Sequence, residues 1–265
     1  GYTVNIPDTE GQTANFAAGP EYGWTTLDSL RAISGHAATG VAKGSPIGLL
    51  GYSGGAIGSG WAAELAPDYA PAIARRIVGT AMGGVLVHPG RNLHYVDGAG
   101  TWAGVMPMAL VGVSRAAGID LTKYANKRGK QVMAEMEKAP ISDVLGRYNG
   151  LTWKSIAKKK YDVPEKVPAF VRTANKLIMS TYGTPSSPMF IGQGSGGELE
   201  GTKGNKPGIG KGDGVMIAGD VRTLVKRWCS RGVDIQYREY PLSHFTSIAL
   251  WLPEAYAWLL ARFGD

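Results

Sequence analysis

The stretch 46–56 contains the candidate nucleophile of this chain. An apolar run ends in Gly-x-Ser-x-Gly, with the serine at position 53, and small residues follow it. This order predicts a strand, a sharp turn and a helix, the geometry that exposes a serine at the carboxyl end of a parallel strand. A chain with 39 glycines can contain the motif by chance, but no other serine has this spacing and these flanking segments. We therefore interpret Ser53 as a nucleophile rather than as a turn residue.

A serine nucleophile requires a base, and the position of each histidine in the chain selects one. In α/β-hydrolases the order along the chain is serine, acid, histidine, with both partners after later strands. His36 precedes the serine, whereas His88 and His94 follow it with later strands still to come. Only His244 lies between a late strand and the last helix, and we predict that it is the base.

The acid that orients this base is expected after the strand at 188–193. We favour Asp213, which is flanked by glycines on a tight turn between that strand and the helix at 221–229. Two alternatives remain open. Glu198 comes sooner after the strand, where the acid often lies, and Asp220 is placed to cap the following helix.

The backbone N–H of Gly54, the residue after the nucleophile, is expected to donate to the oxyanion. A second donor normally comes from a loop after an early strand. Only one strand, at 2–6, is expected before the strand that leads to the nucleophile, so the early strands of such a fold are apparently absent. The sequence thus resembles the carboxy-terminal part of a longer protein.

The apolar patterns predict an α/β fold with a mostly parallel sheet and helices on both faces. Strands alternate with helices in residues 1–90 and 186–265, and Gly83-Gly84 indicates a bend or close backbone approach. We expect two parts of one core, 1–90 and 186–265. The expected strands are 2–6, 47–50, part of 73–87, 188–193 and 235–240, and the expected helices are 25–33, 54–66, 221–229 and 250–263.

Residues 91–185 contain little strand signal and divide the two halves of the sheet pattern. Residues 102–113 are apolar and rich in Ala, Met and Gly, and helices are expected near 121–138, 152–159 and 169–180. We interpret the segment as an inserted helical cap that covers the site and supplies an apolar pocket. A plain helical subdomain without gating is an equally open alternative. The Gly-rich and Lys-rich stretch 194–212 is expected to be a surface loop.

Composition limits the remaining classes. The 265 residues carry a formal charge of +7, no apolar run is long enough to span a membrane, and the one cysteine, Cys229, excludes an intramolecular disulfide and a cysteine metal cluster. The densest basic run, Lys158–Lys160, is expected to be a solvated helix face. We expect no metal, no cofactor and no nucleic-acid partner, whereas contact with a lipid interface stays open.

The chain resembles the secretory lipases, the α/β-hydrolase family of the Candida antarctica lipase A type, with actinobacterial members. The resemblance covers nearly the whole sequence and is looser in the cap. It rests on Gly1-Tyr2-Thr3-Val4, Asp8-Thr9-Glu10-Gly11, Ala17-Ala18-Gly19-Pro20, Leu27 to Ala32, Gly51 to Ala56, Tyr69-Ala70-Pro71, Gly83-Gly84, Cys229 to Gly232 and Tyr240 to His244.

The resemblance implies that Ser53, Asp213 and His244 form a catalytic triad and that Gly54 donates to the oxyanion. It implies a secreted lipase that hydrolyses acylglycerols and other carboxylic esters without a cofactor. A short-chain esterase or acyltransferase, or an inactive lipid-binding fragment, remains the alternative. Family members begin upstream of Gly1, so an upstream segment or a companion chain is expected to complete the fold and to bear the second oxyanion donor.

Overall fold

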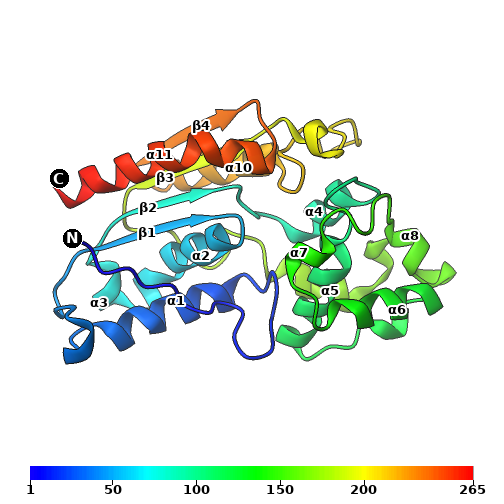
Figure 1. Cartoon of the computed structure of the whole chain (residues 1–265), viewed down its shortest axis with the longest axis horizontal. Helices are drawn as coiled ribbons and strands as arrows, with labels where there is room; N and C mark the ends of the chain where they lie inside the picture. Colours follow the sequence, from blue (N-terminus) through cyan, green and yellow to red (C-terminus); the bar gives the residue numbers. More distant parts are fainter. Residues whose placement is uncertain (265) are drawn as a thin grey trace.

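The protein is described by a computed structural model that covers residues 1–264. Four strands of this part of the chain form one parallel sheet in the order β1-β2-β3-β4 (Figure 1). They are β1 (Ile47–Tyr52), β2 (Ile77–Gly83), β3 (Met189–Gly194) and β4 (Ile235–Tyr240). Because every strand runs in the same direction, all four carboxyl ends meet at one edge of the sheet. The structure has the α/β-hydrolase arrangement expected from the sequence.

The expected strand at 2–6 is wrong. These residues adopt no regular secondary structure, and the side chains of Val4 and Ile6 are 78% and 88% exposed. A β-rich composition forms a strand only where a partner strand or a packed face receives it. No strand of the described residues therefore precedes β1, where the sequence indicated one.

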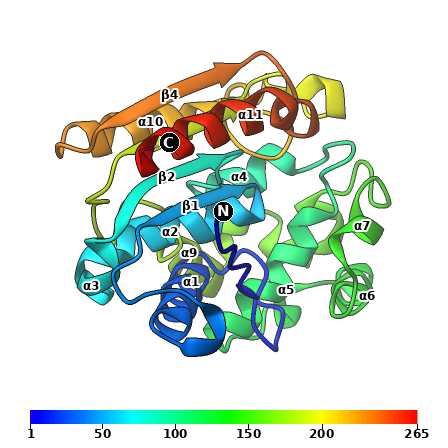
Figure 2. The same cartoon turned by 60° about the vertical axis from the view of Figure 1, so that its left-hand side comes forward.

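Helices cover both faces of the sheet (Figure 2). On one face, α11 (His244–Phe263) packs against β1, β2 and β3, and its Trp251 and Ala255 form a small apolar cluster with Ala81 and Phe190. On the other face lie α1 (Pro20–Ile33), α2 (Gly54–Tyr69) and α10 (Ala218–Cys229), which contribute to the main core. The short α3 (Pro71–Ala74) leads into β2.

Four of these helices extend beyond their expected ends, and among them α10 begins at Ala218, three residues before its expected start. Helix α1 begins at Pro20, where a proline suits the first helical turn, and α11 begins at His244 behind a capping box made by Ser243 and Thr246. Helix α2 continues through Pro67 to Tyr69. Because Pro67 lies in the last turn, the helix loses only one backbone hydrogen bond there.

The segment between β2 and β3 is helical and lies beyond the carboxyl ends of the strands (Figure 1). The helices of this segment are α4 (Pro89–Val96), α5 (Val105–Ala117), α6 (Lys127–Met136), α7 (Ile141–Val144), α8 (Trp153–Ile156) and α9 (Pro168–Asn175). Three of them, α6, α8 and α9, are shorter than the helices expected at 121–138, 152–159 and 169–180.

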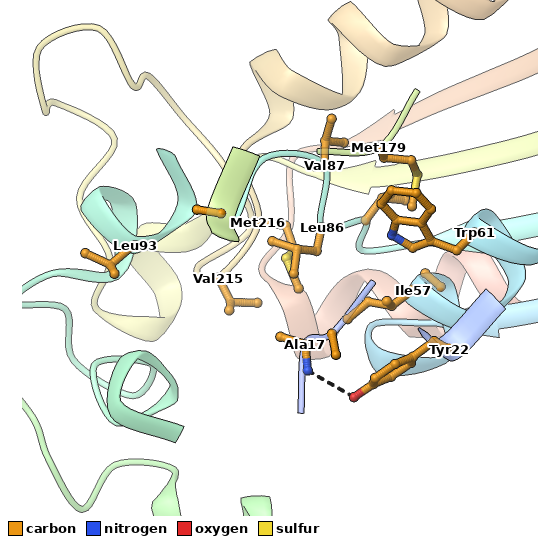
Figure 3. Packing of buried hydrophobic residues seen from close by; sticks show 14 of the residues in the cluster. Ala17, Tyr22, Ile57, Trp61, Leu86, Val87, Leu93, Met179, Val215 and Met216 are labelled. Carbon is orange, nitrogen blue, oxygen red and sulfur yellow. Dashed lines mark hydrogen bonds between the residues drawn. The ribbon is translucent and has the colours of Figure 1, made fainter. Parts of the chain in front are cut away.

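The main core runs without interruption from the sheet into this helical segment. Figure 3 shows Tyr22 of α1 and Ile57 and Trp61 of α2 packed near Leu86 and Met179, which lie just before α4 and just after α9. Among residues 1–264, no helix has the length and the hydropathy that a bilayer crossing requires.

Candidate active site

Ser53 forms a strained turn between β1 and α2. Its φ of 54° and ψ of −116° are unusual for a residue with a Cβ, and its N–H donates to the carbonyl of Gly83 at 2.8 Å. A Cβ on Gly51 would lie 2.0 Å from the carbonyl oxygen of Gly55, so only glycine fits before the serine. A Cβ on Gly55 would meet nothing within 4 Å. The close packing of the end of β1 against the start of α2 therefore requires glycine at position 51 but not at position 55.

Helix α2 begins at Gly54, and no side chain of the described residues caps its first turn. The first N–H groups of a helix have no partner within the helix and lie at its positive end. This end of α2 suits a developing negative charge next to Ser53.

His244 is the first residue of α11 and is only 2% exposed. Its ring centroid lies 5.0 Å from the ring centroids of Tyr52 and of Trp102. The hydroxyl of Tyr52 donates to the His244 carbonyl at 2.5 Å. Gly84 has a φ of 59°, and a Cβ there would lie 2.6 Å from Cε1 of His244. The sequence indicated a bend or close backbone approach at Gly83-Gly84. In the structure, the imidazole of His244 occupies the space that a side chain at Gly84 would need.

Asp213 is fully buried and accepts hydrogen bonds on both carboxylate oxygens. Oδ2 lies 2.7 Å from Nδ1 of His244 and 2.9 Å from Nε2 of Gln193. Oδ1 accepts from the backbone N–H groups of Val215, at 3.0 Å, and Met216, at 2.7 Å. An ionised carboxylate only accepts, so Nδ1 of the imidazole carries the hydrogen and Nε2 is left for a substrate or a serine.

The two rival acids lie elsewhere. Glu198 is exposed on a short 3₁₀ turn. Asp220 is inside the first turn of α10 and is therefore not its N-cap residue, and its Oδ1 accepts from Nε of Arg91 at 2.9 Å. Of the three carboxylates that the sequence left open, the structure brings only Asp213 to His244.

The other histidines have separate structural contacts. Nδ1 of His88 accepts from the N–H of Arg91 at 3.3 Å at the start of α4, and burial lowers the pKa of His88. His94 lies 2.5 Å from Glu165, and His36 precedes a short exposed 3₁₀ turn. None of these three imidazoles contacts Asp213 in the described part of the chain.

Sequence reasoning missed Gln193, which holds the acid from the end of β3. Its Nε2 donates to Asp213, and its Oε1 accepts from the N–H of Val85 at 2.9 Å. The amide therefore links the acid to the chain that follows β2. A polar glutamine at the end of the otherwise apolar run 188–193 was the available sequence signal.

A second missed contact joins the histidine to the helical segment. Glu200 accepts from Nε1 of Trp102 at 2.6 Å and from the backbone N–H of Phe245 at 2.9 Å. The Trp102 ring meets His244 edge-on and stacks on Phe245. One wall of the histidine pocket is therefore made by a residue between β2 and β3.

The loop at 194–212 is less exposed than its composition indicated. Lys206 is half-buried and donates to the carbonyls of His94, at 2.8 Å, and Tyr95, at 3.0 Å, and also to that of Asp97. Burial lowers the pKa of this ammonium group. The lysine closes the carboxyl end of α4 and fixes the middle of the loop.

An apolar cavity of about 310 Å³ opens from Ser53 and Gly54. The polar side chains of Glu10 and Asn92 lie on its wall; Glu10 accepts from the hydroxyl of Tyr22 at 2.9 Å. Figure 3 shows part of this lining. The segment between β2 and β3 contributes most of the apolar wall, which includes Leu93, Val96, Met106, Leu110, Phe170 and Leu177.

No group of three or more His, Cys, Asp or Glu side chains within residues 1–264 is arranged to hold a metal ion. The site consists of a strained serine, a buried carboxylate–imidazole pair and an apolar cavity. Such a combination of groups can support nucleophilic attack by a serine.

Comparison with known proteins gives the family. A model of the secretory lipase family matches residues 1–206. The chain belongs to the secretory lipase family. This secretory lipase family member is 29% identical to Lipase 1 of Candida albicans, over 99% of its own length and 55% of the relative's. It is 28% identical to the trichothecene C-3 esterase of Fusarium sporotrichioides, over 100% of its own length and 58% of the relative's.

A solved structure confirms the α/β-hydrolase fold of this family member. Candida antarctica lipase A in its closed state superimposes with a TM-score of 0.79 and 26% identity, covering 97% of this chain and 57% of that one. The chain thus spans just over half the length of the relatives that it matches.

Proposed function

We propose that this chain forms the catalytic part of a secreted carboxylic ester hydrolase that cleaves acylglycerols. The observation that carries the proposal has two parts: the strained Ser53 lies at the opening of an apolar cavity, and its neighbour Tyr52 contacts His244 of the Asp213–His244 pair. Family membership supports the same class of reaction and, through the family's name, secretion.

In the proposed reaction His244 removes the proton from Ser53, whose Oγ attacks the ester carbonyl. The N–H of Gly54 stabilises the tetrahedral oxyanion. Protonated His244 then gives its proton to the leaving alcohol, and the acyl group remains bound to Ser53 as the acyl-enzyme. In the second half of the reaction His244 removes a proton from water, which attacks the acyl-enzyme, releases the fatty acid and restores the serine. Asp213 keeps the imidazole in the required tautomer and stabilises the imidazolium.

We propose that residues 91–185 act as the cap, with 1–90 and 186–265 as the hydrolase core. The cap supplies the apolar wall of the cavity, where the acyl chain of the substrate would bind. Because the relatives are nearly twice as long as this chain, the proposal includes a further segment or a companion chain that provides the second oxyanion donor.

Hydrolysis of p-nitrophenyl esters from acetate to palmitate tests the proposal, together with labelling by a fluorophosphonate. Ser53→Ala should lose both the activity and the label. Ser59→Ala is the matched control, because Ser59 is buried in the same helix and its hydroxyl has no hydrogen-bond partner among the described residues. This variant should keep both.

The chain-length profile separates the alternatives. Activity on palmitate supports a lipase, whereas an optimum at acetate supports the short-chain esterase or acyltransferase. Absence of labelling in the wild-type protein would overturn the proposal and leave a lipid-binding fragment.

A further inference from the structure

The positive charge of this protein is concentrated in one segment. Residues 91–185 contain 15 of the 28 Lys and Arg residues and 7 of the 21 Asp and Glu residues. This segment therefore carries a formal charge of +8, and all other residues together carry −1. The basic character of the protein belongs to the helical segment and not to the sheet.

Folding gathers much of this charge on one surface. The segments 122–130 and 153–161 lie side by side, because Lys158 N–H donates to the Tyr124 carbonyl at 2.9 Å and Asn126 Nδ2 donates to the carbonyls of Ser155 and Ala157, each at 3.0 Å. Eight exposed basic residues of these two segments form what we call the basic patch: Lys123, Lys127, Arg128, Lys130, Lys154, Lys158, Lys159 and Lys160.

The patch is not the solvated helix face that the sequence predicted. Helix α8 ends at Ile156, and the run Lys158–Lys160 continues as an extended residue and a 3₁₀ turn. The Nζ atom of Lys158 donates to the carbonyl of Lys123 at 2.6 Å. The fold therefore holds these like charges next to the start of α6, although like charges repel one another.

Acidic neighbours neutralise little of the patch. Asp162 pairs with Lys166, which lies outside the patch, at 2.7 Å, and Asp120 accepts from the hydroxyl and N–H of Thr122. The patch residues Lys154 and Lys123 interact with these two carboxylates only at longer range. No ion pair within the described part of the chain includes a member of the basic patch. The patch lies at the end of the molecule away from the sheet (Figure 1).

We propose that the basic patch binds an anionic lipid surface. Lys and Arg side chains near such a surface attract its headgroups, and tyrosines suit the boundary between lipid and water. Here the rings of Tyr124 and Tyr161 meet at 4.9 Å, with Lys123 and Lys160 over their faces. Exposed Val163 adds an apolar side chain next to the run. A lipid surface is favoured over a nucleic acid because the same segment forms the apolar cavity wall; in this respect the inference rests on the proposed function.

Vesicle binding tests the proposal. The protein with Ser53→Ala, which prevents hydrolysis, is mixed with vesicles of phosphatidylcholine alone or with phosphatidylglycerol added, and the bound fraction is measured by sedimentation. We expect binding that requires phosphatidylglycerol and weakens with salt. The patch variant combines Lys127→Gln, Lys130→Gln and Lys159→Gln. Each lysine near an anionic surface contributes about fivefold to membrane binding, so the partition coefficient of the patch variant onto phosphatidylglycerol vesicles should fall by about 100-fold.

The matched control combines Lys43→Gln, Lys203→Gln and Lys226→Gln, three exposed lysines outside the patch. It changes the net charge equally and should alter binding by less than about threefold. An equal loss in both variants, or equal binding to both kinds of vesicle, overturns the proposal. Tighter binding to duplex DNA than to anionic vesicles at the same salt concentration would also overturn it and favour a nucleic acid.

Hydrolysis of soluble p-nitrophenyl acetate separates this proposal from the preceding one. With Ser53 intact, the patch variant and the control should both hydrolyse it at the wild-type rate. Loss of vesicle binding with retained hydrolysis supports a surface role for the patch. A wild-type protein that binds anionic vesicles without hydrolysing any ester would contradict only the proposed catalytic function.

Discussion

Asp213 and His244 are joined by two hydrogen bonds. The backbone N–H of His244 donates to the carbonyl oxygen of Asp213 at 2.7 Å, and the imidazole Nδ1 lies 2.7 Å from Oδ2 of the same residue. The loop after β3 and the start of α11 are therefore fixed to each other by main chain and side chain together. A change in the acid's loop moves the histidine as well.

Asp213→Asn should lower kcat for ester hydrolysis by about 10⁴-fold, because an amide no longer fixes the tautomer of His244. Glu198→Gln is the control for the open alternative, since Glu198 is exposed and should be replaceable within about twofold. Steady-state kinetics on a soluble ester measures both. If Glu198→Gln lost as much activity as Asp213→Asn, our choice of acid would be wrong.

Gly84→Ala should displace the imidazole, because the added Cβ would lie 2.6 Å from Cε1 of His244. We expect kcat to fall by about 100-fold. Gly40→Ala is the matched control: its φ of 67° carries similar backbone strain, but a Cβ there meets nothing within 4 Å. Gly40→Ala should lose about 1 kcal/mol of stability in urea unfolding from backbone strain alone. Gly84→Ala should lose more, because it adds the clash with His244, and only this variant should lose activity. Equal activity in the two would contradict the contact with His244.

Glu64→Gln should destabilise the protein by about 1–3 kcal/mol. The buried carboxylate of Glu64 accepts backbone N–H groups from Ser180 at 2.6 Å, Tyr182 at 2.8 Å and Gly183 at 3.2 Å, and an amide can satisfy only some of them. Urea unfolding measures the difference. The exposed Glu137→Gln should leave stability unchanged.

Glu64 also predicts a pH dependence. Burial raises the pKa of this carboxyl above its ordinary value of 4.5 in the folded protein. As pH rises above 4.5, the unfolded chain therefore releases this proton before the folded protein does, and the stability of the wild type falls. Since glutamine does not titrate, the stability difference between wild type and Glu64→Gln should shrink as pH rises. A difference that grew with pH would contradict the raised pKa.

His88→Asn should remove a stability loss in mild acid. Burial is the main cause that lowers the pKa of His88 from 6.5; nearby Asp220 opposes the shift and Arg91 adds to it. As pH falls through 6.5, the unfolded chain takes up a proton that the folded protein resists, so stability falls. Asparagine keeps a helix-capping acceptor without titrating. The difference in melting temperature between His88→Asn and the wild type should therefore grow as pH falls below 6.5. A difference that stays constant from neutral to acid pH would contradict the prediction.

Local sequence features predicted the nucleophile turn and the sheet because both depend on short-range rules. Apolar runs with glycines on either side indicate buried parallel strands, and the Gly-x-Ser-x-Gly spacing indicates the turn at Ser53. The strand expected at 2–6 fails because a strand also needs a partner, which local sequence does not specify. The exposed Val4 and Ile6 show this dependence.

The contacts that complete the site join residues far apart in the sequence and were not predictable in the same way. Gln193 reaches both Asp213 and Val85, which lies more than 100 residues before it. Trp102 reaches Glu200 and His244 from the helical segment. Among the three candidate acids, distance along the chain favoured Glu198, whereas the three-dimensional path of the loop brings Asp213 to the histidine.

The strained backbone of Ser53 exposes the serine but lowers the stability of the fold. A residue with a Cβ at a φ of 54° and a ψ of −116° stores on the order of 1–3 kcal/mol of strain, which the rest of the fold must offset. Glycine at this position would release most of that strain, so Ser53→Gly should melt at a higher temperature than the wild type while having no nucleophile. The feature that would make the serine reactive is thus also a weak point of the fold, and heat resistance could be gained most directly by giving up the reaction.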